Sequence, residues 1–219
     1  MNTIQSQTDY PIVVPKRKPV YEAVKRLLDI LICSVALILL SPILLIIIIV
    51  IRLDSPGKAI YVSERLTKDG KPFKMYKFRS MRENAEEELD EILDQNEITD
   101  GPAFKMKDDP RVTRVGRFIR KASIDELPQL INVIRGEMTI VGPRPPLPRE
   151  VAEYTPYQRQ RLGVKQGLTC YWQCCGRNNI GFLEWVELDL KYIRERSLWT
   201  DIKIFFKTIF AVFTMKGAE

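Results

Sequence analysis

The chain has 219 residues and contains no histidine. Histidine is the usual general base and the usual partner of a nucleophilic serine or cysteine, so its absence excludes Ser-His and Cys-His schemes. Cysteine is scarce as well: there are four, and Cys170, Cys174 and Cys175 lie close together. A closed zinc site normally takes four ligands, so packing in a reduced compartment is the favoured interpretation of these thiols. Carboxylate chemistry remains for covalent catalysis.

The sequence also has no internal repeat and no low-complexity segment, and its charges are unequal. Lysine and arginine number 34 against 28 acidic residues, which gives a formal net charge of +6 and a pI near 9.1. This excess suits anionic lipid head groups or phosphorylated substrates. Nucleic acid is not expected as a partner, because the basic residues are not interleaved with aromatic stacking motifs.

One long hydrophobic run is present, from residue 30 to residue 51. A membrane span needs roughly 20 apolar residues, but Ser41-Pro42 divides this run into halves of about 10. Proline bends a helix, and a serine hydroxyl can satisfy the carbonyl that the bend frees. Because basic residues flank both ends, the positive-inside rule favours the cytoplasm for both. The run therefore fits a re-entrant membrane hairpin, which the flanking charges support, or a kinked transmembrane anchor, and the residues alone leave both open.

The most informative motif is the acidic pair Asp125-Glu126. Ser123 and Glu126 have the spacing of a capping box, apolar residues follow at helical spacing, and Gly136 is a plausible stop. A helix is therefore expected to begin at the pair. Free N–H groups and the positive end of the helix dipole would keep a carboxylate ionised there and attract phosphate. The alternative is that the two carboxylates are ordinary residues of a helix N-terminus without a catalytic role.

Cations are expected around this pair. Arginine recurs every third residue upstream, at Arg111, Arg114, Arg117 and Arg120. Downstream, prolines hold Arg144 in the stiff segment 142–146, which lowers the entropy lost on clamping a phosphate. Arginine forks bind phosphate oxygens, and a carboxylate that attacks a phosphate needs such neutralisation. A solvated arginine face and a rigid connector are the alternatives.

The rest of the chain predicts an α+β domain over residues 54–219, after a mobile arm at 1–20 and the membrane segment at 21–53. Strands are expected at 59–62 and 73–78, joined by an Asp-Gly turn, with Arg65, Lys77 and Arg79 directed toward phosphates. Helices are expected at 82–95, 149–161 and 182–195. Apolar residues and lysines from 202 to 216 suit a C-terminal helix in the membrane interface, or else a core helix.

Together these motifs resemble the monotopic bacterial polyprenyl-phosphate phosphoglycosyl transferases, the small sugar transferases that begin capsule, exopolysaccharide or glycan assembly. As an ordered set they are highly specific, although each alone is weak. The matching segments are Lys25-Arg26-Leu27-Leu28-Asp29, Ser41-Pro42, Tyr76-Lys77-Phe78-Arg79-Ser80-Met81, Asp125-Glu126-Leu127-Pro128-Gln129, Gly142-Pro143-Arg144-Pro145, Gly176-Arg177-Asn178 and Glu187-Leu188-Asp189.

The resemblance implies a re-entrant helix broken at Ser41-Pro42 and a globular part on the cytoplasmic face of the bacterial inner membrane. It also implies that Asp125 attacks the sugar-linked phosphate of a UDP-sugar, releases UMP and carries the phosphosugar until polyprenyl phosphate, such as undecaprenyl phosphate, accepts it. Membrane lipid is then a further partner.

By the same resemblance, Glu126 helps hold Mg²⁺. Arg144 and an upstream arginine, Arg117 or Arg120, neutralise phosphate oxygens. Arg177 and Asp189 shape the nucleotide-sugar pocket.

Some points depart from the family pattern or stay open. Cys170 stands where many relatives carry glycine, and Cys174-Cys175 stand where valine and a small polar residue are frequent. The motifs do not select a sugar or a pathway, and a homodimer is one alternative for the oligomeric state. With no second large soluble domain, a minimal enzyme is expected. A membrane-anchored basic adaptor and a metal-dependent lipid phosphatase with an aspartate nucleophile are the competing functions.

Overall fold

The computed structural model describes residues 12–13, 15–97, 100–104, 106, 108–175 and 180–214. Arg177 and the rest of its motif lie outside these residues. The elements in chain order are α1 (Pro19–Asp54), β1 (Ile60–Leu66), η1 (Lys68–Gly70), β2 (Pro72–Phe78), η2 (Asp90–Gln95), α2 (Arg114–Lys121), η3 (Ile124–Glu126), α3 (Gln129–Arg135), β3 (Thr139–Val141), α4 (Pro148–Glu153), α5 (Pro156–Arg159), η4 (Gln160–Gly163), β4 (Gly167–Thr169), α6 (Tyr171–Cys175), α7 (Phe182–Glu195) and α8 (Leu198–Thr214). Helices and strands are thus mixed in an α+β arrangement.

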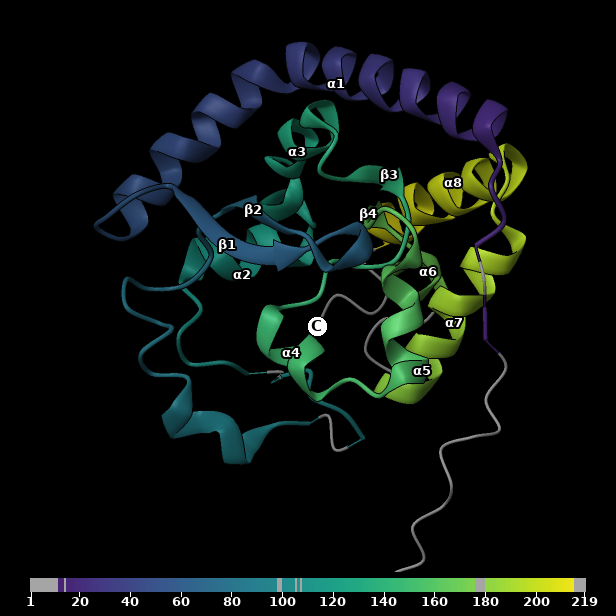
Figure 1. Ribbon diagram of the computed structural model, residues 1–219. Coiled ribbons are helices and arrows are strands. Elements are labelled where there is room, and N and C mark those ends of the chain that lie inside the picture. The colour runs from purple at the N-terminus through teal and green to yellow at the C-terminus, as the bar shows by residue number, and fades with distance from the viewer. Residues whose placement is uncertain are drawn as a thin grey trace, which may run out of the picture.

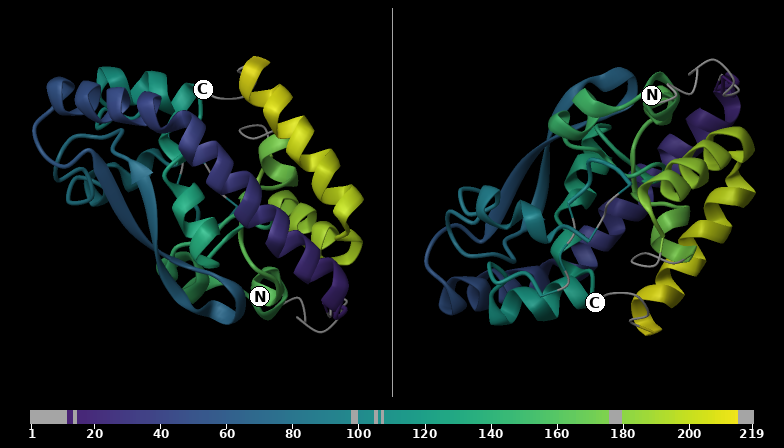
Figure 2. Two further views of the ribbon diagram at one scale, coloured as in Figure 1. Left: turned by 90° about the horizontal axis from the view of Figure 1, so that it is seen from above. Right: turned by 90° about the horizontal axis from the view of Figure 1, so that it is seen from below.

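Helix α1 is one continuous helix of 36 residues that passes through Pro42. Pro42 cannot donate to the carbonyl of Ile38, and the hydroxyl of Ser41 donates to that oxygen instead, at 2.8 Å. This confirms the expected use of the serine. The helix forms an arc in Figure 1 and looks nearly straight from above in Figure 2. Its secondary structure does not break at Ser41-Pro42, and the re-entrant path stays a prediction.

The outer surface of α1 is strongly apolar. Within the described part of the chain it is the one helix long and apolar enough to cross a membrane, and 6% of its most apolar window is buried. Its exposed side chains include Leu31, Ile38, Leu39, Leu45, Ile46 and Ile49. Apolar surface of this extent favours contact with lipid over contact with water.

Polar side chains near the start of α1 attach it to the globular part. Arg26 donates to the last carbonyls of α3 at 2.5 and 2.6 Å, and Lys25 pairs with Asp201 of α8 at 2.7 Å. Asp29, only 4% exposed, accepts from the hydroxyl of Thr139 at 2.6 Å and from the N–H of Ile140 at 3.2 Å. The motif at 25–29 thus fixes α3 and β3 against the apolar helix.

The described end of the predicted mobile arm also packs on the globular part. The carbonyl of Lys16 accepts from Arg196 at 2.6 Å, and Lys18 donates to the carbonyl of Arg196 at 2.7 Å. Pro19, counted within the arm, already begins α1, where a proline needs no helical N–H partner.

Strands β1 and β2 form the predicted antiparallel hairpin, with pairs running from Ile60 opposite Phe78 to Leu66 opposite Pro72. Asp69 and Gly70 both have positive φ, 59° and 71°, as the expected Asp-Gly turn requires. Successive side chains alternate between the two faces of a strand. Phe78 packs with Ile51 of α1, and Lys77 points to the opposite face.

Two predicted helices differ from the structure. Residues 82–89 form turns, with φ of 65° at Asn84, and only a 3₁₀ helix follows at η2, so the helix expected over 82–95 is wrong. The segment 149–161 is broken into α4, α5 and η4, because Thr155 caps a new helix by accepting from the N–H of Gln158 and Pro156 takes its first position. Helix α7 confirms the helix expected at 182–195, and α8 confirms that the C-terminal segment is helical, while its place in the membrane interface stays a prediction.

A short parallel pair, β3 and β4, supports the site. Thr139 lies opposite Gly167, and Val141 lies opposite Thr169. The strands are so close here that a Cβ on Gly167 would lie 2.1 Å from the backbone nitrogen of Gly142. Strand β3 leads into the segment of Arg144, and β4 leads into α6. Seen from above, α1 runs between the hairpin on one side and helices α7 and α8 on the other (Figure 2).

Candidate active site

The acidic pair lies in the short 3₁₀ helix η3, not at the start of an α-helix. Ser123 adopts the left-handed conformation, with φ of 56°, and makes no capping hydrogen bond, so the predicted capping box is wrong. Helix α3 begins only at Gln129, after Pro128, and it ends at Gly136 as expected. The side chain of Glu126 lines a pocket.

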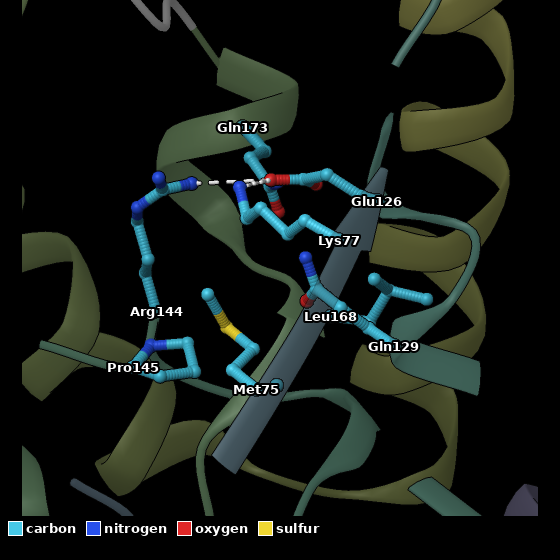
Figure 3. A pocket seen from close by; sticks show the side chains of 9 residues that line it. Met75, Lys77, Glu126, Gln129, Arg144, Pro145, Leu168 and Gln173 are labelled. Atoms are coloured by element: carbon cyan, nitrogen blue, oxygen red, sulfur yellow. Dashed lines mark hydrogen bonds and ion pairs between the residues drawn. The ribbon is translucent and has the colours of Figure 1, made fainter. Parts of the chain in front are cut away.

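Three donors from distant parts of the chain surround Glu126 (Figure 3). Lys77 Nζ lies 3.0 Å from Glu126 Oε1, and Arg144 Nη1 lies 3.5 Å from the same oxygen. Gln173 Nε2 donates to Oε2 at 3.1 Å. The strand β2, the segment after β3 and the helix α6 therefore meet at one carboxylate.

Asp125 is the deeper member of the pair, with 8% of its surface exposed. Its Oδ2 atom lies 3.8 Å from Lys77 Nζ. Burial raises the pKa of Asp125, Lys77 opposes the rise, and the charge of Glu126 adds to it. The predicted cause of ionisation, a helix N-terminus, is therefore replaced by an ammonium group, which offsets only part of the cost of burial.

Arg144 has a second guanidinium beside it. Arg65 donates to the carbonyl of Pro145 at 3.2 Å, and burial together with the charge of Arg144 lowers the pKa of Arg65 to about 10. Two buried or half-buried cations of like charge repel, so an anion between or beside them would be stabilised. Arg65 and Arg144 therefore lie close together, and their binding of phosphate stays a prediction.

The cavity beside the pair combines charged and apolar walls. Its lining consists of Met75, Lys77, Glu126, Gln129, Arg144, Pro145, Gly167, Leu168 and Gln173 (Figure 3). Its apolar part comes from the hairpin and from β4, and its charges come from η3, β2 and the segment after β3.

The upstream arginines do not form one ladder. Arg111 precedes α2 and is buried in a two-pronged pair with Asp109, with contacts of 2.7 and 2.9 Å. Arg114, Arg117 and Arg120 lie on α2 and are exposed. Arg120 is near enough to Asp125 to lower the pKa of that carboxyl, so it is the member of the series that acts on the pair.

Arg79 lies at the end of α1. It donates to the backbone carbonyl of Ser55 at 2.6 Å, to the hydroxyl of Ser55 at 2.9 Å and to the carbonyl of Pro56. The structure does not bring its guanidinium to the carboxylate of Glu126. These contacts hold the connection between α1 and the hairpin.

Asp189 is fully buried and is paired with the equally buried Arg161. Burial raises the pKa of Asp189 to about 6, which leaves it ionised at neutral pH beside Arg161. Tyr154 also accepts from Arg161, at 2.9 Å. The expected place of Asp189 in a nucleotide-sugar pocket is not what the structure shows, since α7 turns this side chain into the core.

Sequence reasoning missed two neighbours in α6. Gln173 binds Glu126, and the guanidinium carbon of Arg144 lies 5.7 Å from the ring centre of Trp172. Nothing in their local pattern marks them as site residues. Their nearness to the motif at 176–178 is the one signal that could have found them.

Mg²⁺ is the ion that the family resemblance implies. Within the described ranges, no cluster of three or more Asp, Glu, Cys or His side chains could hold a metal alone. Mg²⁺ commonly binds one or two carboxylates together with waters and substrate phosphates. The adjacent carboxylates of Glu126 and Asp125, beside cations suited to a diphosphate, fit that mode of binding.

A carboxylate pair, with Asp125 buried and Glu126 half-buried, lies among ammonium, guanidinium and amide donors and defines a site suited to phosphate chemistry. The family model described as bacterial sugar transferase matches residues 20–215. The exopolysaccharide production protein ExoY of Rhizobium meliloti (strain 1021) is 38% identical over 225 residues, which cover 100% of both chains. The chain belongs to the bacterial sugar transferase family.

Two further relatives are longer proteins. The galactosyl transferase CpsE of Streptococcus agalactiae serotype III (strain NEM316) is 46% identical over 203 residues, 89% of this chain and 43% of that protein. The UDP-glucose:undecaprenyl-phosphate glucose-1-phosphate transferase of Escherichia coli (strain K12) is 42% identical over 221 residues, 94% of this chain and 44% of that protein. The chain thus spans less than half the length of these two relatives.

Proposed function

We propose that this protein is a phosphoglycosyl transferase that moves a sugar 1-phosphate from a UDP-sugar to a polyprenyl phosphate such as undecaprenyl phosphate. The products are a polyprenyl-diphospho-sugar and UMP, and the reaction is a first membrane step of exopolysaccharide, capsule or glycan assembly. The observation that supports it best is the buried Asp125 beside Lys77, next to the convergent Arg65 and Arg144. The names of the relatives support the same reaction class.

In the proposed reaction, a carboxylate oxygen of Asp125 attacks the sugar-linked phosphorus of the donor. The bond from that phosphorus to the bridging oxygen breaks, and UMP leaves with the electron pair. An oxygen of polyprenyl phosphate then attacks the same phosphorus, and the carboxylate of Asp125 leaves. Each step exchanges one P–O bond for another, so no oxidant or further reactant is needed.

The surrounding residues have separate tasks in this scheme. Lys77 stabilises the ionised form of Asp125, and Arg144 with Arg65 neutralises phosphate oxygens. Gln173 and Lys77 hold the carboxylate of Glu126, the residue proposed to bind Mg²⁺. When bound, Mg²⁺ supplies charge neutralisation on the diphosphate.

For the membrane, we propose that α1 is re-entrant and that the globular part lies on the cytoplasmic face of the bacterial inner membrane. The proline at position 42 inside α1, the satisfied carbonyl of Ile38 and the apolar exterior of the helix support this path. Reporter fusions test it: one fusion before Pro19 and another after the last residue should both report the cytoplasm. Opposite locations would identify a spanning helix.

The decisive experiment is UMP release by purified protein from a panel of UDP-sugars, with Mg²⁺ and undecaprenyl phosphate. Release should depend on the lipid and should be abolished by Asp125→Asn. Asp69→Asn, at the exposed hairpin turn, is the matched control and should retain activity. Without acceptor, a labelled sugar phosphate should become bound to the protein and be removed by hydroxylamine. Release of inorganic phosphate would indicate a phosphatase, and no release from any donor would favour the adaptor.

A further inference from the structure

Four aromatic and basic side chains form a stack that leads from the core to the pocket. The guanidinium carbon of Arg161 lies 4.6 Å from the ring centre of Trp185. The rings of Trp185 and Trp172 are stacked, with centres 4.8 Å apart and an interplanar angle of 22°. Arg144 lies over Trp172 at 5.7 Å. The order is therefore Arg161, Trp185, Trp172, Arg144.

The inner end of this stack is firmly held. Arg161 and Asp189 are both fully buried and paired, and Arg161 also donates to the hydroxyl of Tyr154 at 2.9 Å. Trp185, with 7% of its surface exposed, lies one helical turn before Asp189 on α7. A buried ion pair has few alternative arrangements, because separating the charges would leave each without compensation. The first indole thus has a fixed support.

The outer end is where the stack meets the proposed chemistry. Arg144 retains 28% side-chain exposure and lies 3.5 Å from Glu126. Trp172 and Gln173 are consecutive residues of α6, and Gln173 binds Glu126 at 3.1 Å. One short helix therefore touches both the cation and the carboxylate of the pocket.

We propose that Trp172 is the positioning residue of Arg144, and that the stack from Arg161 through Trp185 holds it in place. A guanidinium held over an indole by cation–π attraction can still donate its N–H groups to oxygen ligands. The indole thus restricts the arginine to the orientation that faces Glu126 and, on the proposed function, the donor diphosphate. Lysine at position 144 would not be equivalent, because an ammonium lacks the planar fork of donors that a guanidinium presents to phosphate.

A spectroscopic test needs no substrate. Tryptophan emission is compared between the wild type and Arg144→Gln, and then between Trp172→Phe and the double variant. The loss of the guanidinium should change the emission only where Trp172 is present. An equal change in the Trp172→Phe background, or none in the wild type, would overturn the stack. The circular dichroism couplet of the two indoles should disappear in Trp172→Phe. A couplet that persisted in this variant would also overturn the stack.

Positioning is tested by a double-mutant cycle on kcat/KM for UMP release and on UDP affinity without acceptor. Trp172→Leu and Arg144→Lys should each lower kcat/KM by about tenfold or more, with little further loss in the double variant, since both remove the same aligned cation. Trp172→Phe should retain much of the kcat/KM that Trp172→Leu loses. The proposal would be overturned if the losses in kcat/KM of the two single variants multiplied in the double variant. It would also be overturned if Trp172→Phe were no more active than Trp172→Leu.

Trp199→Leu is the matched control, because this exposed tryptophan on α8 also carries a cation, Lys203, at 5.2 Å. It should leave kcat/KM for UMP release and the affinity for UDP unchanged. If the wild type released no UMP, the proposed function would fail, whereas the emission and dichroism measurements would still decide whether the stack holds Arg144.

Discussion

The Nζ atom of Lys77 lies 3.0 Å from Glu126 and 3.8 Å from Asp125, so one ammonium group serves both carboxylates. Two adjacent carboxylates, one buried and one half-buried, repel each other, and a shared cation reduces the free energy of ionising both. Strand β2 delivers this cation from 48 residues before Asp125. The ionisation of the proposed nucleophile therefore depends on the hairpin.

Replacing Lys77 should change the pH dependence of kcat/KM on its acidic side. Lys77→Met removes the charge that lowers the pKa of Asp125, so that pKa rises and the acidic limb of the kcat/KM profile moves to higher pH. Activity at neutral pH should fall and should partly recover in alkaline buffer. Lys74→Met, on the exposed face of the same strand, is the control. An unchanged acidic limb would mean that Lys77 does not govern this ionisation.

Glu126→Gln should separate metal binding from nucleophilic attack. The amide keeps the shape of the side chain but loses the charge, so the Mg²⁺ concentration for half-maximal activity should rise by about tenfold or more. High Mg²⁺ should recover part of the rate, in contrast to Asp125→Asn. Glu64→Gln, exposed on β1, should show the dependence of the wild type. The same Mg²⁺ requirement in Glu126→Gln would remove Glu126 from the proposed ligands.

Asp29→Asn should loosen the attachment of α1 to β3. It removes the charge from a buried group that accepts from Thr139 and from the N–H of Ile140, so the free energy of unfolding should fall by about 1–3 kcal/mol. Thermal unfolding in detergent measures this change, again with Asp69→Asn as control. Equal stability of both variants would show that the hydrogen bonds of Asp29 contribute little.

Asp189→Asn should act on stability before it acts on substrate affinity. It leaves the buried guanidinium of Arg161 without its counter-charge, a change that typically costs about 3–5 kcal/mol. The double variant Arg161→Met with Asp189→Leu should recover part of this loss, since it leaves no buried charge. A raised KM for the donor with normal thermal stability would instead return Asp189 to the substrate pocket.

Local patterns predicted several elements correctly because the cause of each is local. Asp69-Gly70 tolerates positive φ and reverses the chain, Pro42 removes a helical donor that Ser41 replaces, and Gly136 ends α3. Local patterns failed at Ser123, where a left-handed residue and Pro128 delay the helix. Local patterns also failed at 82–95, where apolar residues recur at helical spacing but Asn84 has a positive φ that an α-helix does not allow.

The sequence by itself determined the chemical inventory: no histidine, the acidic pair Asp125-Glu126, an excess of basic residues and one long apolar run that contains a proline. Only the tertiary structure decided which charges meet. Asp189 joins Arg161 in the core, Arg79 binds the end of α1, and Gln173 reaches Glu126 across 47 residues. The physical reason is that backbone preference acts over a few residues, whereas partners for buried polar groups are set by the packing of distant segments.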